Sequence, residues 1–134
     1  MDLSQINLKV AAEEGITVNL MHPTTGEPLK DEKGKSIAIV VLGKDSEKWQ
    51  SVAKLNNTKN SSRYKNKPVP QSALEATLYD ILAECTVSWS DSIEFDAVKL
   101  KCTKENALMM YQERNWIAEQ VLEAAGDRAN LFLK

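Results

Sequence analysis

Between residues 16 and 43 the chain alternates apolar and polar positions as a half-buried β-strand does. The stretch "ITVNLM" places Ile16, Val18 and Leu20 two residues apart, on one face of a strand. The later stretch "SIAIVVLG", residues 36–43, is rich in β-branched residues and ends at a glycine, which indicates a second strand with a buried face. Together the two stretches predict a β-hairpin.

The residues between these strands, "HPTTGEPLKDEKGKS" (22–36), predict a long charged loop with two turns. Pro23 and Pro28 lack the N–H that a strand ladder needs. Gly26 and Gly34 allow the positive φ that tight turns require. We therefore expect this segment to be structural, although it also contains the chain's only histidine.

A short helix is expected before the hairpin. Leu3, Ile6 and Val10 follow one another at i, i+3 and i+7, which places them on one helical face, and Gly15 is a suitable stop. A helix is therefore expected within the first 15 residues.

After the hairpin, "KDSEKWQSVAKLNNTKN" predicts a longer helix. Asp45 or Ser46 is suited to cap its N-terminus. Its expected buried stripe comprises Trp49, Val52, Ala53 and Asn56. The following residues, 57–70, have no apolar period and are rich in Asn, Ser, Lys and Pro, so we expect a flexible linker there.

The remaining residues, 71–134, have a helical pattern. The strongest amphipathic stripe comprises Leu74, Leu78, Ile81, Leu82, Cys85 and Trp89. The stretch "SWSDSIEFDAVKLKC" breaks this period and suits an irregular connection with a short strand. Thr103 and Asn115 are expected to cap two further helices. The closing helix has a stripe of Ala118, Val121, Leu122, Ala125 and Ala129.

These elements predict a single α+β domain over residues 1–134. Residues 1–56 form a small antiparallel hairpin or sheet plus a helix, residues 57–70 a linker, and residues 71–134 a helical part. With no apolar run near the ~18 residues of a membrane span and no signal-peptide pattern at the start, we expect a cytosolic protein.

Charge is distributed unevenly along the chain. The net charge of −2 divides into −2 for residues 1–43, +5 for residues 44–70 and −5 for residues 71–134. The two cysteines, Cys85 and Cys102, match neither a CxxC nor a zinc-site spacing, so both are expected to be small buried apolar residues.

Candidate chemistry is sparse. His22 has no second histidine or nearby cysteine with which to ligate a metal. "LGKDS" lacks the glycine pattern of a phosphate loop, and the 22–36 loop lacks the acidic core of an EF-hand. The acidic group Asp91, Glu94 and Asp96 fits solvated loop positions better than acid–base catalysis. The sequence therefore favours a protein that is not an enzyme and needs no metal or cofactor.

The basic segment offers one alternative. Lys59, Arg63, Lys65 and Lys67 surround Tyr64, a pattern that would contact phosphates and stack on a base. The acidic second half of the chain opposes this interpretation, so nucleic-acid binding is kept only as a second alternative.

Several segments, in order, resemble tail assembly chaperones of long-tailed bacteriophages and prophages. They are "HPTTGEPLKDEKGKSIAIVVLGKDSEKW", "VSWSDSIEF", "TKENALMMYQ" and "NWIAEQVLEAAGDRANLF", and they cover most of the chain outside residues 57–70. Two details depart from the family pattern. Asn115 stands where proline is commoner, and "EFDAVKLKC" lacks the glycine that commonly makes a turn after the acid.

The resemblance implies a structural role without enzymatic activity or cofactor. Such a protein binds the tape measure protein, keeps it soluble in the host cytoplasm and helps tail-tube subunits polymerise around it. It is absent from the mature virion, and related phages also make a longer form by ribosomal frameshifting. Self-association is left open. The first alternative is a structural minor tail or tail completion protein, which would remain in the virion.

A partner surface is expected near "ALMMY", residues 107–111. Five consecutive apolar residues on a helix cannot all face one core. The spacing favours Ala107, Leu108 and Tyr111 facing inward. Met109 and Met110 are then candidates for the surface that binds the tape measure protein, because methionine adapts to varied helical partners. The alternative is that both methionines pack against the closing helix.

Overall fold

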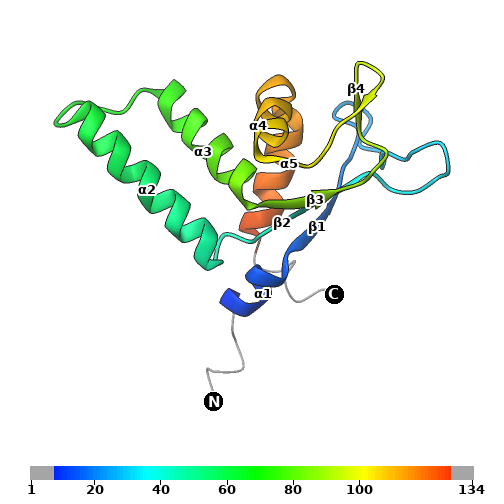
Figure 1. Cartoon of the computed structure of the whole chain (residues 1–134), viewed down its shortest axis with the longest axis horizontal. Helices are drawn as coiled ribbons and strands as arrows, with labels where there is room; N and C mark the ends of the chain where they lie inside the picture. The colour runs from blue at the N-terminus through cyan, green and yellow to red at the C-terminus, as the bar shows by residue number, and fades with distance from the viewer. Residues whose placement is uncertain (1–7, 128–134) are drawn as a thin grey trace, which may run out of the picture.

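The computed structural model describes residues 8–127 and combines one small sheet with helices (Figure 1). In chain order the elements are α1 (Leu8–Glu14), β1 (Ile16–Asn19), β2 (Ala38–Val41), α2 (Glu47–Tyr64), α3 (Gln71–Cys85), β3 (Thr86–Trp89), β4 (Glu94–Phe95), β5 (Val98–Lys99), α4 (Lys104–Glu113) and α5 (Asn115–Gly126). The expected α+β class is confirmed. The order differs, because a third strand, β3, enters the sheet from the helical half.

The sheet is antiparallel in the order β1-β2-β3. Val18 pairs with Ile39 and Ile39 pairs with Trp89, so one face carries buried side chains across all three strands. Helix α5 contacts both β1 and β2 and covers this face. The buried alternation predicted for Ile16, Val18 and Leu20 is confirmed.

The loop between β1 and β2 has the two turns that its sequence predicts. Leu29 returns between the strand ends: its N–H donates to the Leu20 carbonyl, and its own carbonyl accepts from Ile37 N–H, both at 2.9 Å. Gly26 and Gly34 have φ of +74° and +79°, which glycine adopts without a steric penalty. The loop is therefore an ordered extension of the hairpin.

Helix α1 ends at Gly15, as expected, where φ is +91°. Its buried contact differs from the expected stripe: Val10 is 51% exposed, whereas Ala12 is fully buried. A Cβ added to Gly43 would lie 2.8 Å from the Ala12 Cβ, so this glycine allows α1 to approach the end of β2. Leu3 and Ile6 lie outside the described residues.

Helix α2 begins where the sequence predicts. The buried Ser46 is its N-cap, and the Ser46 hydroxyl accepts a hydrogen bond from Trp49 N–H at 3.2 Å. Its end differs: α2 continues to Tyr64, so the expected linker over 57–70 is wrong for residues 57–64. Polar contacts to α3 hold this part in place of apolar ones: Asn60 Nδ2 donates to Thr77 Oγ1 at 3.1 Å.

The stripe expected on α3 is only partly buried. Ile81, Leu82 and Cys85 are in the core, whereas Leu74 and Leu78 are 44% and 39% exposed. The two leucines precede the part of α3 that the body of the protein covers (Figure 1). Trp89 is buried as expected but lies in β3 rather than on the helix.

Helices α4 and α5 complete the body. Thr103 caps α4 as expected, accepting from Asn106 N–H at 3.1 Å. Asn115 does not cap α5: it is the first helical residue, and the cap position, Arg114, makes no side-chain cap bond. Of the expected α5 stripe, the structure buries Ala118, Val121 and Ala125 and half-buries Leu122, whereas Ala129 lies outside the described residues.

Two polar contacts orient the last two helices. The Gln120 side chain of α5 donates to and accepts from the backbone of Met21, both at 2.8 Å, and so pairs with the chain just beyond β1. Lys104 at the start of α4 reaches Asp80 and Glu84 on α3, at 3.2 and 2.7 Å. Among the described helices, none is long and apolar enough to cross a membrane.

Candidate partner-binding surfaces

Two ionisable side chains of the long loop, His22 and Asp31, support its own turns. His22 Nδ1 accepts hydrogen bonds from the N–H groups of Thr24 and Thr25, at 3.1 and 3.2 Å. Asp31 Oδ1 accepts from Lys33 and Lys35 N–H, and the bond from Lys35 is the main reason that the pKa of Asp31 is lowered. These contacts give the loop a structural role.

The acids singled out in the sequence show no catalytic arrangement. Asp91, Glu94 and Asp96 are all exposed. Across residues 8–127, no group of three or more histidine, cysteine or carboxylate side chains is placed to hold a metal ion. A shallow hollow beside the loop is lined by both signs of charge, Lys30, Lys33, Lys35 and Lys99 against Asp31, Glu32, Asp91 and Glu94, so it favours neither anions nor cations.

The two cysteines differ in environment. Cys85 is fully buried, and burial raises its pKa to about 11, so it is a core residue as expected. Cys102 is exposed, and the prediction that it is buried is wrong. It lies in the irregular segment between β5 and α4, where no helical or strand period directs it into the core.

The methionine pair on α4 is divided by the fold. Met110 is fully buried with Ala107 and Tyr111, so its assignment to a partner surface is wrong. The inward face uses the i, i+3, i+4 spacing, and Leu108 lies at its edge, half-buried. Met109 is half-buried and about 150° from the middle of that face, so its role in a partner surface remains a prediction.

A second candidate surface is the helical arm, which we define as residues 47–80: α2, the connecting residues 65–70 and the first part of α3. Its free end projects from the body (Figure 1). The two helices are joined by polar contacts: Asn56 Nδ2 donates to Asp80 Oδ2 at 3.0 Å, in addition to the Asn60–Thr77 bond. Polar side chains on both helices therefore contribute to the contact between them.

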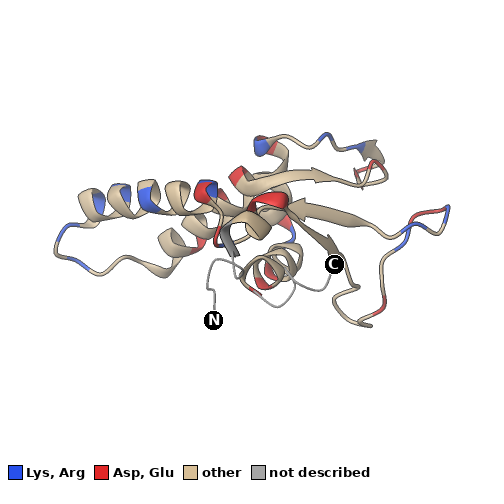
Figure 2. Cartoon of the chain, turned by 90° about the horizontal axis from the view of Figure 1, so that it is seen from below, with Lys and Arg blue, Asp and Glu red and all other residues tan. Residues whose placement is uncertain are grey.

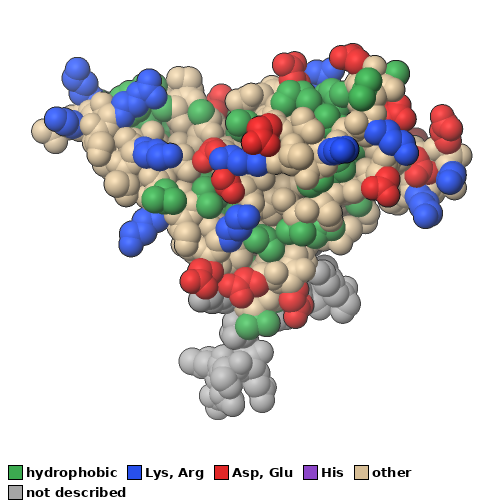
Figure 3. All heavy atoms as spheres, in the orientation of Figure 1, with side chains coloured by type: hydrophobic (Ala, Val, Ile, Leu, Met, Phe, Trp, Pro, Cys, Tyr) green, Lys and Arg blue, Asp and Glu red, His purple; other side chains and the backbone are tan. Residues whose placement is uncertain are grey.

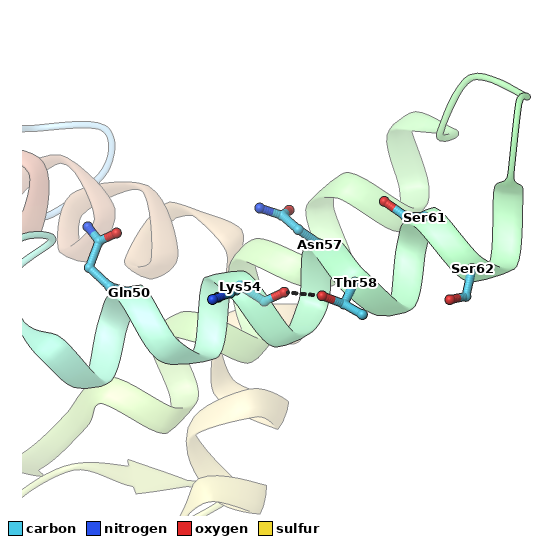
Figure 4. A pocket seen from close by; sticks show the side chains of 6 residues that line it. All are labelled: Gln50, Lys54, Asn57, Thr58, Ser61 and Ser62. Carbon is cyan, nitrogen blue, oxygen red and sulfur yellow. Dashed lines mark hydrogen bonds between the residues drawn. The ribbon is translucent and has the colours of Figure 1, made fainter.

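One side of α2 carries a stripe of polar side chains, of which only Lys54 is charged. The shallow surface there is lined by Gln50, Lys54, Asn57, Thr58, Ser61 and Ser62 (Figure 4). The Thr58 hydroxyl donates to the Lys54 carbonyl on its own helix at 3.0 Å. This stripe has no convergent groups that would hold a small ligand.

Basic side chains are concentrated on the helical arm. They follow α2 to its free end, whereas acidic side chains lie mainly on the body and the loops (Figure 2). The arm, residues 47–80, carries +3, and the rest of the sequence therefore carries −5, given the total of −2. Figure 3 shows the basic groups over α2 with apolar surface between them.

The aromatic residue of the basic segment is already engaged. The Arg63 guanidinium carbon lies 5.5 Å from the centre of the Tyr64 ring, and Tyr64 is half-buried. A ring covered in this way is poorly placed to stack on a base.

Exposed leucines lie on two different sides of the helical arm. Leu55 on α2 is 62% exposed, and Leu74 and Leu78 on α3 are 44% and 39% exposed. The α3 pair continues the stripe that is buried further along the helix. Leu55 does not continue a buried stripe, since it is roughly 100° from the side of α2 that faces α3.

No family model, curated protein or solved structure matches this chain. The functional argument therefore rests on the residues themselves. Sequence reasoning missed the helical arm, because it ended α2 near residue 57, and it did not identify Leu55. The signal was weak: on a helical projection Leu55 lies about 120° from Trp49 but only about 60° from Val52.

Proposed function

We propose that this chain is a non-enzymatic assembly chaperone, a protein that holds another polypeptide in a soluble form during the construction of a larger particle. More specifically, we propose a tail assembly chaperone of a long-tailed bacteriophage or prophage. It would act in the host cytoplasm and bind the tape measure protein while tail-tube subunits assemble. The observation that carries this proposal is the ordered set of resembling segments, from the 22–49 hairpin region to the closing helix.

The physical character of the chain supports this role. A long helical client exposes apolar stripes that aggregate unless another surface covers them. Covering such stripes needs exposed apolar side chains with charged surroundings, and helix-in-groove recognition uses this combination. The helical arm carries exposed leucines beside lysines, and the half-buried Met109 is adaptable in shape.

The test is co-expression with the tape measure protein encoded in the same tail gene cluster. We expect the tape measure protein to be insoluble alone and to become soluble and co-purify when this chain is present. Met109→Glu tests the remaining methionine assignment, because it should leave the fold intact and reduce co-purification. Met110→Glu is a matched comparison and should unfold the protein. A tape measure protein that stays insoluble with the wild-type chain would contradict the proposed function.

Analysis of purified virions separates the proposal from its first alternative. A chaperone should be missing from intact particles by mass spectrometry, whereas a minor tail or tail completion protein should be present in a fixed ratio to the tube protein. Its presence in that ratio would replace the proposal with a structural tail role.

A further inference from the structure

We propose that the face of α2 formed by Lys48, Leu55 and Lys59 is a docking surface for an acidic amphipathic helix. The binding chemistry is argued from this chain alone. The identity of the partner, a helical segment of the tape measure protein, rests on the proposed function.

The three side chains lie on one narrow strip of the helix. At 100° per residue, Lys48, Leu55 and Lys59 fall within about 40° of one another. Leu55 is 62% exposed, and both lysines are exposed. At 1.5 Å per residue the lysines are about 16 Å apart along α2, with the leucine between them, a length that two to three turns of a partner helix would match. The apolar patch among basic groups in Figure 3 lies over this helix.

Folding does not explain the leucine at position 55. The buried side of α2 carries Trp49 and the half-buried Val52 and Ala53, which pack on the core. The two asparagines that donate to α3, Asn56 and Asn60, lie on the same side. Leu55 points roughly 100° away from that side, into solvent. Val52, which is half-buried and lies between Trp49 and Leu55 around the helix, extends the apolar centre of the strip. An apolar strip flanked by charged side chains is the kind of surface that an amphipathic partner helix covers.

Charge complementarity identifies the partner as acidic. The segment that includes this face carries +5, so glutamates or aspartates on either side of an apolar position would meet Lys48 and Lys59. A nucleic acid is less suited to the same face, because the exposed leucine offers nothing to phosphates and Arg63 already covers Tyr64. The observations therefore favour an acidic helix over a nucleic acid.

Binding of a designed peptide probe tests the surface directly. The probe is a labelled amphipathic helical peptide with leucines along one stripe and flanking glutamates, and its control has lysines in place of the glutamates. Fluorescence anisotropy of the full chain should show binding of the acidic peptide and not of the basic one. Affinity should fall as salt is added, because exposed charges are screened.

Matched variants locate the binding site. Leu55→Ser and Lys59→Glu should each weaken binding by about tenfold or more, the loss expected when a side chain at the centre of a small interface is removed or reversed. Leu74→Ser is the control, because Leu74 is an exposed leucine on another side of the arm. Circular dichroism should show unchanged folding for all three variants. If the acidic peptide does not bind, or if Leu55→Ser binds it as wild type does, the proposal is wrong.

Further measurements test whether another molecule occupies this face. They also distinguish failure of the docking surface from failure of the proposed function. An oligonucleotide bound more tightly than the acidic peptide would assign the arm to nucleic acid. A dimer in light scattering that Leu55→Ser dissociates would assign the face to a second copy, and either result overturns the proposal. Peptide binding with no effect on tape measure solubility would retain the docking surface and reject the proposed function. Tape measure rescue that Leu55→Ser leaves intact would retain the proposed function and reject the tape measure protein as the partner of this face.

Discussion

The tight turn between β4 and β5 contains an alanine in a conformation that glycine prefers. Phe95 pairs with Val98, so Asp96 and Ala97 alone form the turn, with φ of +52° and +64°. Positive φ at both central residues defines a type I′ turn, in which Asp-Gly is among the favoured pairs. Ala97→Gly should therefore stabilise the protein.

The expected gain follows from two opposing effects. The left-handed conformation costs an L-residue about 1–2 kcal/mol, and glycine removes that cost. Glycine also has greater freedom in the unfolded chain, which costs about 0.5–1 kcal/mol on folding. Ala97 is exposed, so loss of its methyl group leaves no cavity. The net effect should be a gain of about 0.5–1 kcal/mol and a rise in Tm of about 2–4 °C.

A matched alanine provides the control. Ala76 is also exposed but lies inside α3, where Ala97's left-handed conformation does not occur. Ala76→Gly makes the same change to the unfolded chain and should destabilise the protein by about 1 kcal/mol. Urea and thermal unfolding of both variants measure the difference in the free energy of unfolding. If Ala97→Gly lowers stability as Ala76→Gly does, the turn is not of this type.

Three further predictions follow from burial. Ile81→Ala should lower the free energy of unfolding by about 2–5 kcal/mol, as buried large-to-small changes do. Leu78→Ala should lower it by about 1 kcal/mol or less, because that side chain is 39% exposed and its removal leaves no closed cavity. Equal shifts in urea midpoint would contradict this. Ser46→Ala should cost about 1–2 kcal/mol through the lost N-cap bond, and a smaller effect of Ser46→Ala than of an exposed serine variant would refute the capping role. The native protein should react with a thiol reagent at Cys102 only, with Cys85 reacting after denaturation; labelling of Cys85 first would be inconsistent with its burial.

Local signals in the sequence predicted local structure well. The caps at Ser46 and Thr103 are confirmed, as are the strands around Val18 and Ile39. Each of these features depends on side chains within about four residues, such as a hydroxyl that accepts an N–H three positions later. The double-turn loop is confirmed for the same reason.

Features that depend on distant elements were predicted poorly. Leu74 and Leu78 have the same helical spacing as Ile81, but the spacing does not indicate where the covering elements end. Either Met110 or Leu108 could face inward beside Ala107 and Tyr111. The packing of α4 against α3 and α5 buries Met110 and leaves Leu108 half-buried. A short strand was expected within residues 88–102, but β3 begins at Thr86, directly after α3, where the helical stripe was expected to continue to Trp89.

The candidate surface on α2 could not be predicted from the sequence, because α2 was expected to end near residue 57. The sequence suggests a linker at residues 57–70 because Asn, Lys and Ser provide no apolar stripe, yet Asn56 and Asn60 join α2 to α3 through hydrogen bonds. Trp49, Val52 and Ala53 provide the apolar packing of α2, so the helix does not depend on the exposed Leu55 for its own stability. Leu55 is exposed between two lysines and is not needed for that packing, so this strip is the part of α2 that we propose as the docking surface for an acidic helix.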